Sequence, residues 1–86
     1  MSRMVRIYRS ARRAQMYLFV DAAEDLERVP ETLMRHFGRP VEAMQLDLHA
    51  ERKLARADAG VVLERIEAEG FYLQMPPPDS EIPAGG

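Results

Sequence analysis

The sequence predicts one small α+β domain, an α/β sandwich in which about four strands form a sheet with helices packed on it. Three observations support this prediction. The chain has 86 residues, which suits a single domain. Four short segments have the composition or alternation of strands, and two others repeat apolar residues with helical spacing. Their order along the chain is β-β-α-β-α-β.

The first two strands are predicted over residues 4–9 and 16–21. In the first, Val5 and Ile7 share one face, as alternate residues of a strand do. The second is aromatic, β-branched and apolar on both faces, which indicates a central strand covered on both sides. Residues 10–15 between them are few and polar, so we expect an antiparallel hairpin.

A short helix is predicted over residues 30–37, after an acidic connection. Pro30 suits the first helical position, because its missing N–H has no partner there in any case. Gly38 suits the left-handed position after the last turn, and Pro40 prevents the helix from continuing.

The second half of the chain adds a strand, a longer helix and a last strand. Residues 41–48 alternate, and residues 71–75 do so again. Between them, Asp58 is a suitable N-cap and Gly70 a suitable C-cap for a helix with one apolar stripe. The two connections that contain helices are long enough for crossovers, which allows a mixed sheet instead of a purely antiparallel one.

We expect residues 1–86 to form one domain, with an ordered body over residues 3–75 and a Pro-rich, flexible tail over residues 76–86. The chain has no cysteine, which suits a reducing environment, so we expect a cytoplasmic protein. Its longest apolar runs have five residues, whereas a membrane span needs about 18, so no membrane contact is expected.

Apolar residues at the periodic positions are expected to form most of a thin core. They are Val5, Ile7, Leu18, Val20, Leu33, Phe37, Leu46, Val62, Ile66 and Leu73.

Charge is distributed unevenly along the chain. The net charge is −2, but residues 1–20 carry five arginines and no acid, whereas residues 21–31 carry five acids and one arginine. This asymmetry indicates either a surface for a nucleic acid or another polyanion, or two segments that lie side by side and neutralise each other.

The candidate anion or RNA contacts are Arg9, Arg12, Arg13 and Tyr8. The arginines would meet phosphates and the tyrosine would stack on a base. Against this interpretation, the pI of about 5.6 is below the value of about 9 that is common in nucleic-acid-binding domains. Arg9 could instead pair with an acid across the end of the hairpin, namely Asp21, Glu24 or Asp25.

No residue set has the spacing of a catalytic, cofactor-binding or metal-binding motif. Ser10, Asp47 and either His36 or His49 are the residue types of a catalytic triad, but any chain of this composition contains such a set. Asp47 and His49 could share a face as two metal ligands, but they lack a third ligand. We therefore assign no catalytic residue, no cofactor and no metal, and we expect a protein that is not an enzyme.

Several blocks of sequence together resemble one known family. They are Ile7-Tyr8-Arg9-Ser10, Val29-Pro30, Phe37-Gly38, Lys53-Leu54, Tyr72-Leu73-Gln74 and Pro76-Pro77-Pro78. In order and spacing they are similar to the YcgL family of small gammaproteobacterial proteins over residues 4–78. The resemblance implies a compact α/β sandwich, and it carries no assigned activity, so it transfers no catalytic residue to this chain.

The leading hypothesis is a non-catalytic interaction module that binds a protein partner or itself. The alternative is an accessory protein that binds RNA or another polyanion through the arginine-rich hairpin. The oligomeric state and the identity of the partner stay open at this point.

Overall fold

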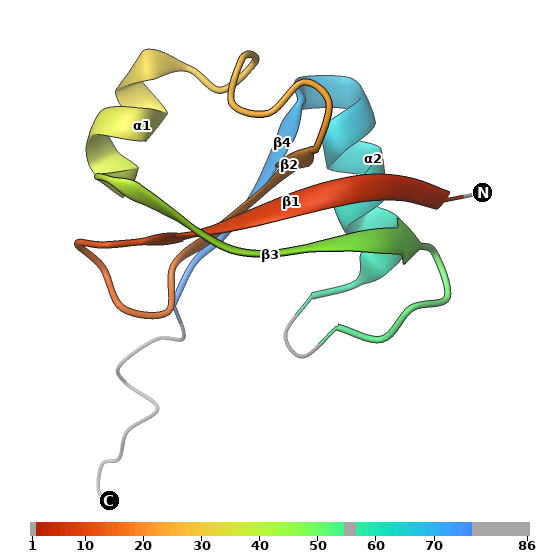
Figure 1. The fold of residues 1–86 in the computed structure, drawn as a ribbon. Coiled ribbons are helices and arrows are strands. Elements are labelled where there is room, and N and C mark those ends of the chain that lie inside the picture. The colour runs from red at the N-terminus through yellow and green to blue at the C-terminus, as the bar shows by residue number, and fades with distance from the viewer. Residues whose placement is uncertain (1, 55–56, 77–86) are drawn as a thin grey trace, which may run out of the picture.

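The computed structural model describes residues 2–54 and 57–76. It contains the predicted elements in the predicted order, which confirms the α+β class (Figure 1). They are β1 (Ser2–Ser10), β2 (Tyr17–Asp21), α1 (Glu31–Phe37), β3 (Pro40–His49), α2 (Ala59–Glu69) and β4 (Phe71–Gln74). The predicted tail over residues 76–86 lies, apart from Pro76, outside the described residues.

The four strands form one antiparallel sheet in the order β3-β1-β2-β4. The predicted hairpin joins β1 to β2, and Arg9 lies opposite Tyr17 near its closed end. The mixed sheet that the connection lengths allowed does not form. Although β2 and β3 run in the same direction, β1 lies between them and pairs with both, so every described ladder is antiparallel.

The two helices cover opposite faces of the sheet. On the face of α2, the buried cluster consists of Val5, Ile7, Phe19, Leu48, Ala59, Val62 and Ile66. On the face of α1, it consists of Met16, Leu18, Val20, Val29 and Phe37. Residues of β2 contribute to both clusters, which confirms that this strand is covered on both sides. In Figure 1, α1 lies over the end of the sheet with the β1–β2 hairpin, and α2 lies over the other end.

Most of the predicted core is buried. Leu33, Leu46 and Leu73 are partly buried and pack against the two clusters, while the other seven predicted core residues are buried. The buried apolar side chains outside the predicted set, among the described residues, are Met16, Phe19, Val29, Leu48 and Ala59. An alternating pattern selects the residues of one strand face as core. It therefore selected Leu18 and Val20 but not Phe19, which is buried on the other face of β2.

The ends of α2 follow the predicted chemistry more closely than those of α1. Asp58 accepts hydrogen bonds from two backbone N–H groups of the first turn, and Gly70 ends the helix with a φ of 91°. A Cβ at Gly70 would lie 2.4 Å from the Cβ of Arg28, so the acidic connection packs closely there. Pro30 occupies the N-cap position of α1, one residue before the predicted position, and no side chain caps that helix. Within the described residues, neither helix has the length and apolar character needed to cross a membrane.

Candidate functional site

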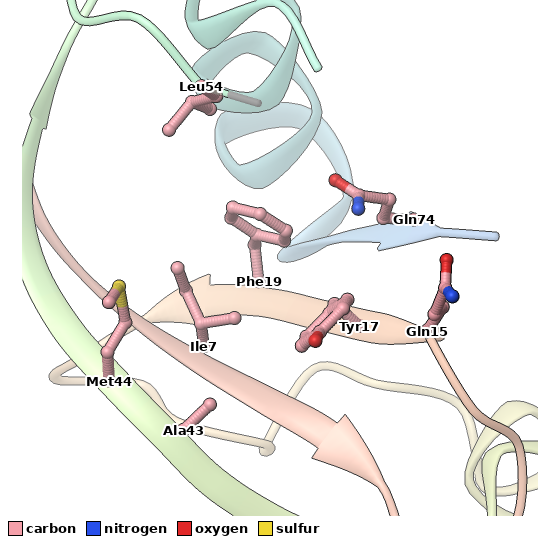
Figure 2. A pocket seen from close by; sticks show the side chains of 8 residues that line it. All are labelled: Ile7, Gln15, Tyr17, Phe19, Ala43, Met44, Leu54 and Gln74. Atoms are coloured by element: carbon pink, nitrogen blue, oxygen red, sulfur yellow. The ribbon is translucent and has the colours of Figure 1, made fainter. Parts of the chain in front are cut away.

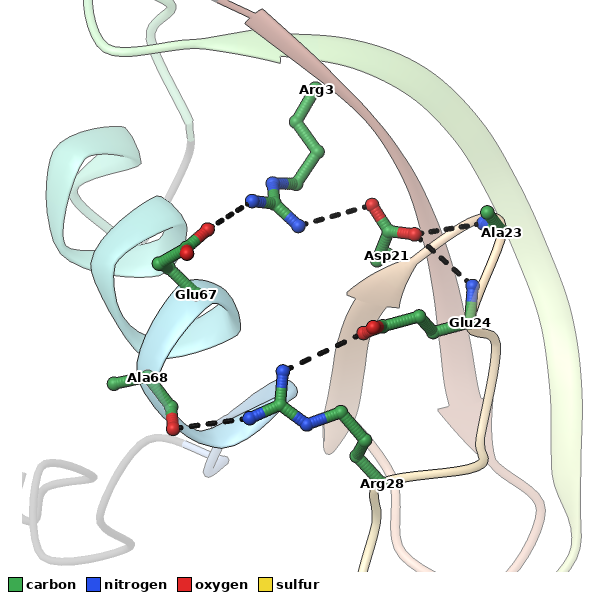
Figure 3. A network of polar contacts seen from close by, with 7 residues as sticks. All are labelled: Arg3, Asp21, Ala23, Glu24, Arg28, Glu67 and Ala68. Atoms are coloured by element: carbon green, nitrogen blue, oxygen red, sulfur yellow. Dashed lines mark hydrogen bonds and ion pairs between the residues drawn. The ribbon is translucent and has the colours of Figure 1, made fainter.

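Arginines near the N-terminal end of the fold are neutralised by acidic partners. Arg3 donates to Asp21 at 3.2 Å and also pairs with Glu67 of α2 (Figure 3). In the same region, Arg28 lies 3.7 Å from Glu24 and donates to a backbone carbonyl oxygen at the end of α2 at 3.2 Å. The acidic connection is therefore partly neutralised by arginines, and it is held against α2.

Arg6 and Tyr8 converge on Asp25, on the face of the sheet that α1 covers. The Tyr8 hydroxyl donates to Asp25 at 2.6 Å, and Arg6 lies 3.1 Å from the other carboxylate oxygen. Burial, and then the hydrogen bond to Asp25, raises the pKa of the Tyr8 hydroxyl. Tyr8 points to the opposite face of β1 from Arg9, so the structure does not bring it together with the other candidate contacts.

The three candidate arginines lie at the hairpin end of the sheet. Arg9, Arg12 and Arg13 are exposed, and in the part of the chain that the structure describes none of them forms an ion pair. Arg12 donates to the carbonyl oxygen of Arg35 at 3.5 Å, and Arg13 to that of His36 at 3.3 Å. Both oxygens belong to the last turn of α1, where the helix dipole favours cations.

The pairing of Arg9 with the acidic connection, considered from the sequence, does not form. Asp21 pairs with Arg3, and Asp25 pairs with Arg6. Arg3 and Arg6 lie earlier on β1 than Arg9. In the described part of the chain, the arginines of residues 1–20 that have no acidic partner therefore lie at the closed end of the hairpin.

Three further basic residues that sequence reasoning did not place here join this end, namely Arg35, His36 and Arg39. The first two lie in the last turn of α1, and the carbonyl oxygen of Arg39 accepts a hydrogen bond from the hairpin N–H of Ala11 at 3.0 Å. All three side chains are exposed. No sequence signal places the end of α1 beside the hairpin; the contact arises from the fold. We define the basic end as Arg9, Arg12, Arg13, Arg35, His36 and Arg39.

Ser10 fixes the hairpin against the end of α1. Its buried hydroxyl donates to the carbonyl oxygen of Phe37 at 2.5 Å and accepts from the N–H groups of Arg12 and Arg13 at 3.0 and 2.9 Å. The side chain of Arg12 then passes over Gly38, where an added Cβ would lie 3.1 Å from the Arg12 Cβ. A buried serine therefore sets the directions in which these two arginines leave the hairpin.

The face of the sheet that α2 covers has an open apolar groove at the hairpin end, with a volume of about 440 Å³ (Figure 2). All four strands, the hairpin loop and the loop before α2 contribute side chains to it. The lining residues are Ile7, Gln15, Tyr17, Phe19, Ala43, Met44, Leu54 and Gln74. In Figure 2, Leu54 faces Ile7 and Phe19 from across the groove. The groove is the part of this sheet face that lies beyond α2.

A bulge in β3 shapes one wall of the groove. Ile7 lies opposite Met44, whereas the next residue, Tyr8, lies opposite Glu42, so Ala43 is the extra residue of the bulge. Met44 is 52% exposed although it belongs to the apolar lining. A flexible thioether at this position can adapt to the shape of a bound apolar group.

The groove itself is uncharged, but a positive charge borders it. Among the described residues, its polar groups are the side-chain amides of Gln15 and Gln74 and the hydroxyl of Tyr17. Arg9 follows Ile7 by two residues on β1 and lies opposite Tyr17, so its side chain is on the groove face. This arrangement suits an apolar group that has an acidic group next to it.

The residues of the candidate triad are held apart by the β1–β3 ladder. Ser10 lies opposite Pro40, whereas Asp47 lies opposite Met4 and His49 opposite Ser2, toward the other end of β1. Ser10 is therefore distant from Asp47 whichever histidine is considered. Within the described ranges, no three His, Asp or Glu side chains are grouped closely enough to hold a metal ion.

Comparison with known proteins gives a consistent result. The family model described as the YcgL domain matches residues 5–77. A YcgL domain-containing protein of Pseudomonas entomophila (strain L48) is 53% identical over 81 residues, which cover 94% of this chain and 84% of the relative. One from Pseudomonas aeruginosa (strain PAO1) is 51% identical over the same shares of the two chains. The names of these relatives state a domain and no ligand.

Proposed function

The chain belongs to the YcgL family, and on this premise we propose that it is a non-catalytic binding module whose apolar groove receives a protein partner. The observation that carries the proposal is the uncharged groove that stays open beyond α2. Exposed apolar surface on a small domain is typical of an interaction site, because burying it against a partner removes it from water.

We take the occupant to be a short protein segment with a large apolar side chain next to acidic residues. The groove volume of about 440 Å³ is large enough to enclose such a side chain. A polar small molecule with many hydrogen-bonding groups would leave most of them unpaired there, since the lining offers two glutamine amides, one tyrosine hydroxyl and otherwise apolar groups. Arg9, at the border, would meet an acidic residue beside the apolar anchor and fix the register of the segment.

Nuclear magnetic resonance can test this proposal with defined peptides. The probe is an acidic peptide with a central Leu-Phe pair, titrated into the ¹⁵N-labelled protein and compared with the same peptide carrying lysines. We expect the acidic peptide to shift the amide signals of Ile7, Tyr17 and Met44, and the basic peptide to bind more weakly.

A matched pair of variants separates the groove from the rest of the sheet. Met44 and Met4 are both exposed on the sheet, at 52% and 46%, but Met4 points to the other face. Met44→Glu should weaken binding of the acidic peptide at least about fivefold, because it puts a buried negative charge against the ligand. Met4→Glu should leave the affinity unchanged. Equal effects of the two variants, or no shifts at millimolar peptide, would disprove the docking site.

A further inference from the structure

We propose that the basic end binds the phosphate backbone of a single-stranded nucleic acid. This site adjoins the groove and shares Arg9 with it, but its other residues lie outside the groove, and the inference does not depend on the protein-binding function. The observation that carries it is the contrast along β1, where the early arginines are paired with acids and the arginines of the closed hairpin end are not.

The charge of the basic end is largely available for a ligand. Among its five arginines and one histidine, the described ion pairs include one, between Arg35 and Glu31 at 3.8 Å on the exposed surface of α1. An exposed pair of this kind contributes little and exchanges readily with solvent. The acids of residues 21–25 are held by other arginines, so they do not compete for this site.

The hairpin arginines keep the donors that phosphate recognition needs. A guanidinium has five N–H donors in a planar fork. Arg12 uses its Nη1 and Arg13 its Nε to hold helix carbonyl oxygens, and each retains further N–H groups that can bind two phosphate oxygens together. Because the Ser10 hydroxyl fixes the backbone of both residues, the two forks are partly ordered before a ligand arrives.

The placement of the cations favours a flexible strand over a duplex. Arg9 projects on the groove face of the sheet, whereas Arg12 and Arg13 reach the end of α1 on the other face. A ligand that meets all of them must turn around the closed end of the hairpin. A single strand can do this, while a duplex is stiff over about 150 base pairs.

The experiment measures fluorescence anisotropy of a labelled oligouridine of about ten nucleotides, a length within the usual site size of single-strand binders. The test variant is Arg12→Gln/Arg13→Gln/Arg39→Gln. The matched control is Arg52→Gln/Lys53→Gln/Arg65→Gln, which removes the same charge from exposed positions elsewhere. Circular dichroism verifies the fold of both, and Arg9→Gln/Arg39→Gln serves as a second variant if the triple variant does not fold.

The parent should lose about tenfold in affinity for a threefold rise in salt, as three phosphate contacts on a single strand predict. The test variant should bind at least about tenfold more weakly at low salt and show a flatter salt dependence. The control should behave like the parent. No binding at low salt, or equal losses in both triple variants, would overturn the proposal. Equal competition by polyglutamate would do so too, because it would assign the surface to acidic proteins.

Discussion

The two faces of the sheet are held by different kinds of interaction. On the face of α2, an eleven-residue helix with a side-chain cap packs its apolar residues against the sheet. On the face of α1, a seven-residue helix has Phe37 as its buried residue and has no side-chain cap. Hydrogen bonds from the hairpin, through Ser10, Arg12 and Arg13, connect its last turn to the sheet.

The difference explains where the two candidate surfaces lie. On the face that α2 covers, apolar side chains are buried under the helix, and an apolar groove stays open beyond it. On the face of α1, hydrogen bonds from Ser10, Arg12 and Arg13 hold the last turn of the helix at the hairpin end, and two of these three side chains are cationic. The longer, more apolar α2 thus accompanies an apolar groove on its face, and the shorter α1 accompanies the basic end on the other.

The largest expected effects come from truncating the buried anchor of each helix. Phe37→Ala should lower the free energy of unfolding by about 3–5 kcal/mol and Ile66→Ala by about 2–5 kcal/mol, because both side chains are fully buried. Urea denaturation measures both, with the exposed Val61→Ala on α2 as a control that should stay close to the parent. A small loss for Phe37→Ala alone would show that the fold does not need α1 to be docked.

A smaller loss of unfolding free energy is expected when the hydrogen bonds of Ser10 on the α1 face are removed. Ser10→Ala leaves the carbonyl oxygen of Phe37 and two backbone N–H groups without their partner, so it should cost about 1–3 kcal/mol. Ser2→Ala, at the exposed start of β1, is the control. If both variants unfold at the same urea concentration as the parent, polar contacts do not hold this face.

The helix caps should differ between the two faces. Asp58→Ala removes the acceptor of two N–H bonds at the start of α2 and should cost about 1 kcal/mol, whereas Asp58→Asn should retain most of the stability. Since no side chain caps α1, Pro30→Ala should have a smaller effect. Equal losses at Asp58 and Pro30, measured by thermal unfolding, would contradict the contrast between the helices.

The smallest expected effect concerns the polar cluster under the acidic connection. Tyr8→Phe removes the hydrogen bond to Asp25 and should cost about 0.5–1.5 kcal/mol at neutral pH. The pKa of Tyr8 is raised by burial and by Asp25, so the folded state favours the neutral hydroxyl. Its contribution is therefore complete below the ordinary tyrosine pKa of about 10 and is lost as the pH rises above it.

Denaturation curves at neutral and at alkaline pH measure this contribution as the difference between the parent and Tyr8→Phe. The difference should shrink as the pH rises. An unchanged difference across that range would show that the pKa of Tyr8 is not coupled to folding.

Parts of the candidate sites were readable from the sequence and parts were not. Arg9, Arg12 and Arg13 follow from the charge of residues 1–20 and the polar turn. Strand alternation puts Tyr8 on the face of β1 opposite Arg9, whereas its hydrogen-bond partner Asp25 comes from another segment. Arg39 joins the basic end through a backbone hydrogen bond to Ala11, and neither residue carries a local signal for that contact. The groove has no motif, because residues from all four strands build it.

The sequence by itself determined the identity and order of the elements. Alternation, capping residues and glycines act within a few residues of where they stand, so β2, the Asp58 cap and the end of α2 at Gly70 were all predictable. The tertiary structure decided the strand order, which arginines meet acids, and which part of the sheet α2 leaves uncovered. These depend on contacts between segments distant in the chain, and local residue patterns do not specify which segments meet.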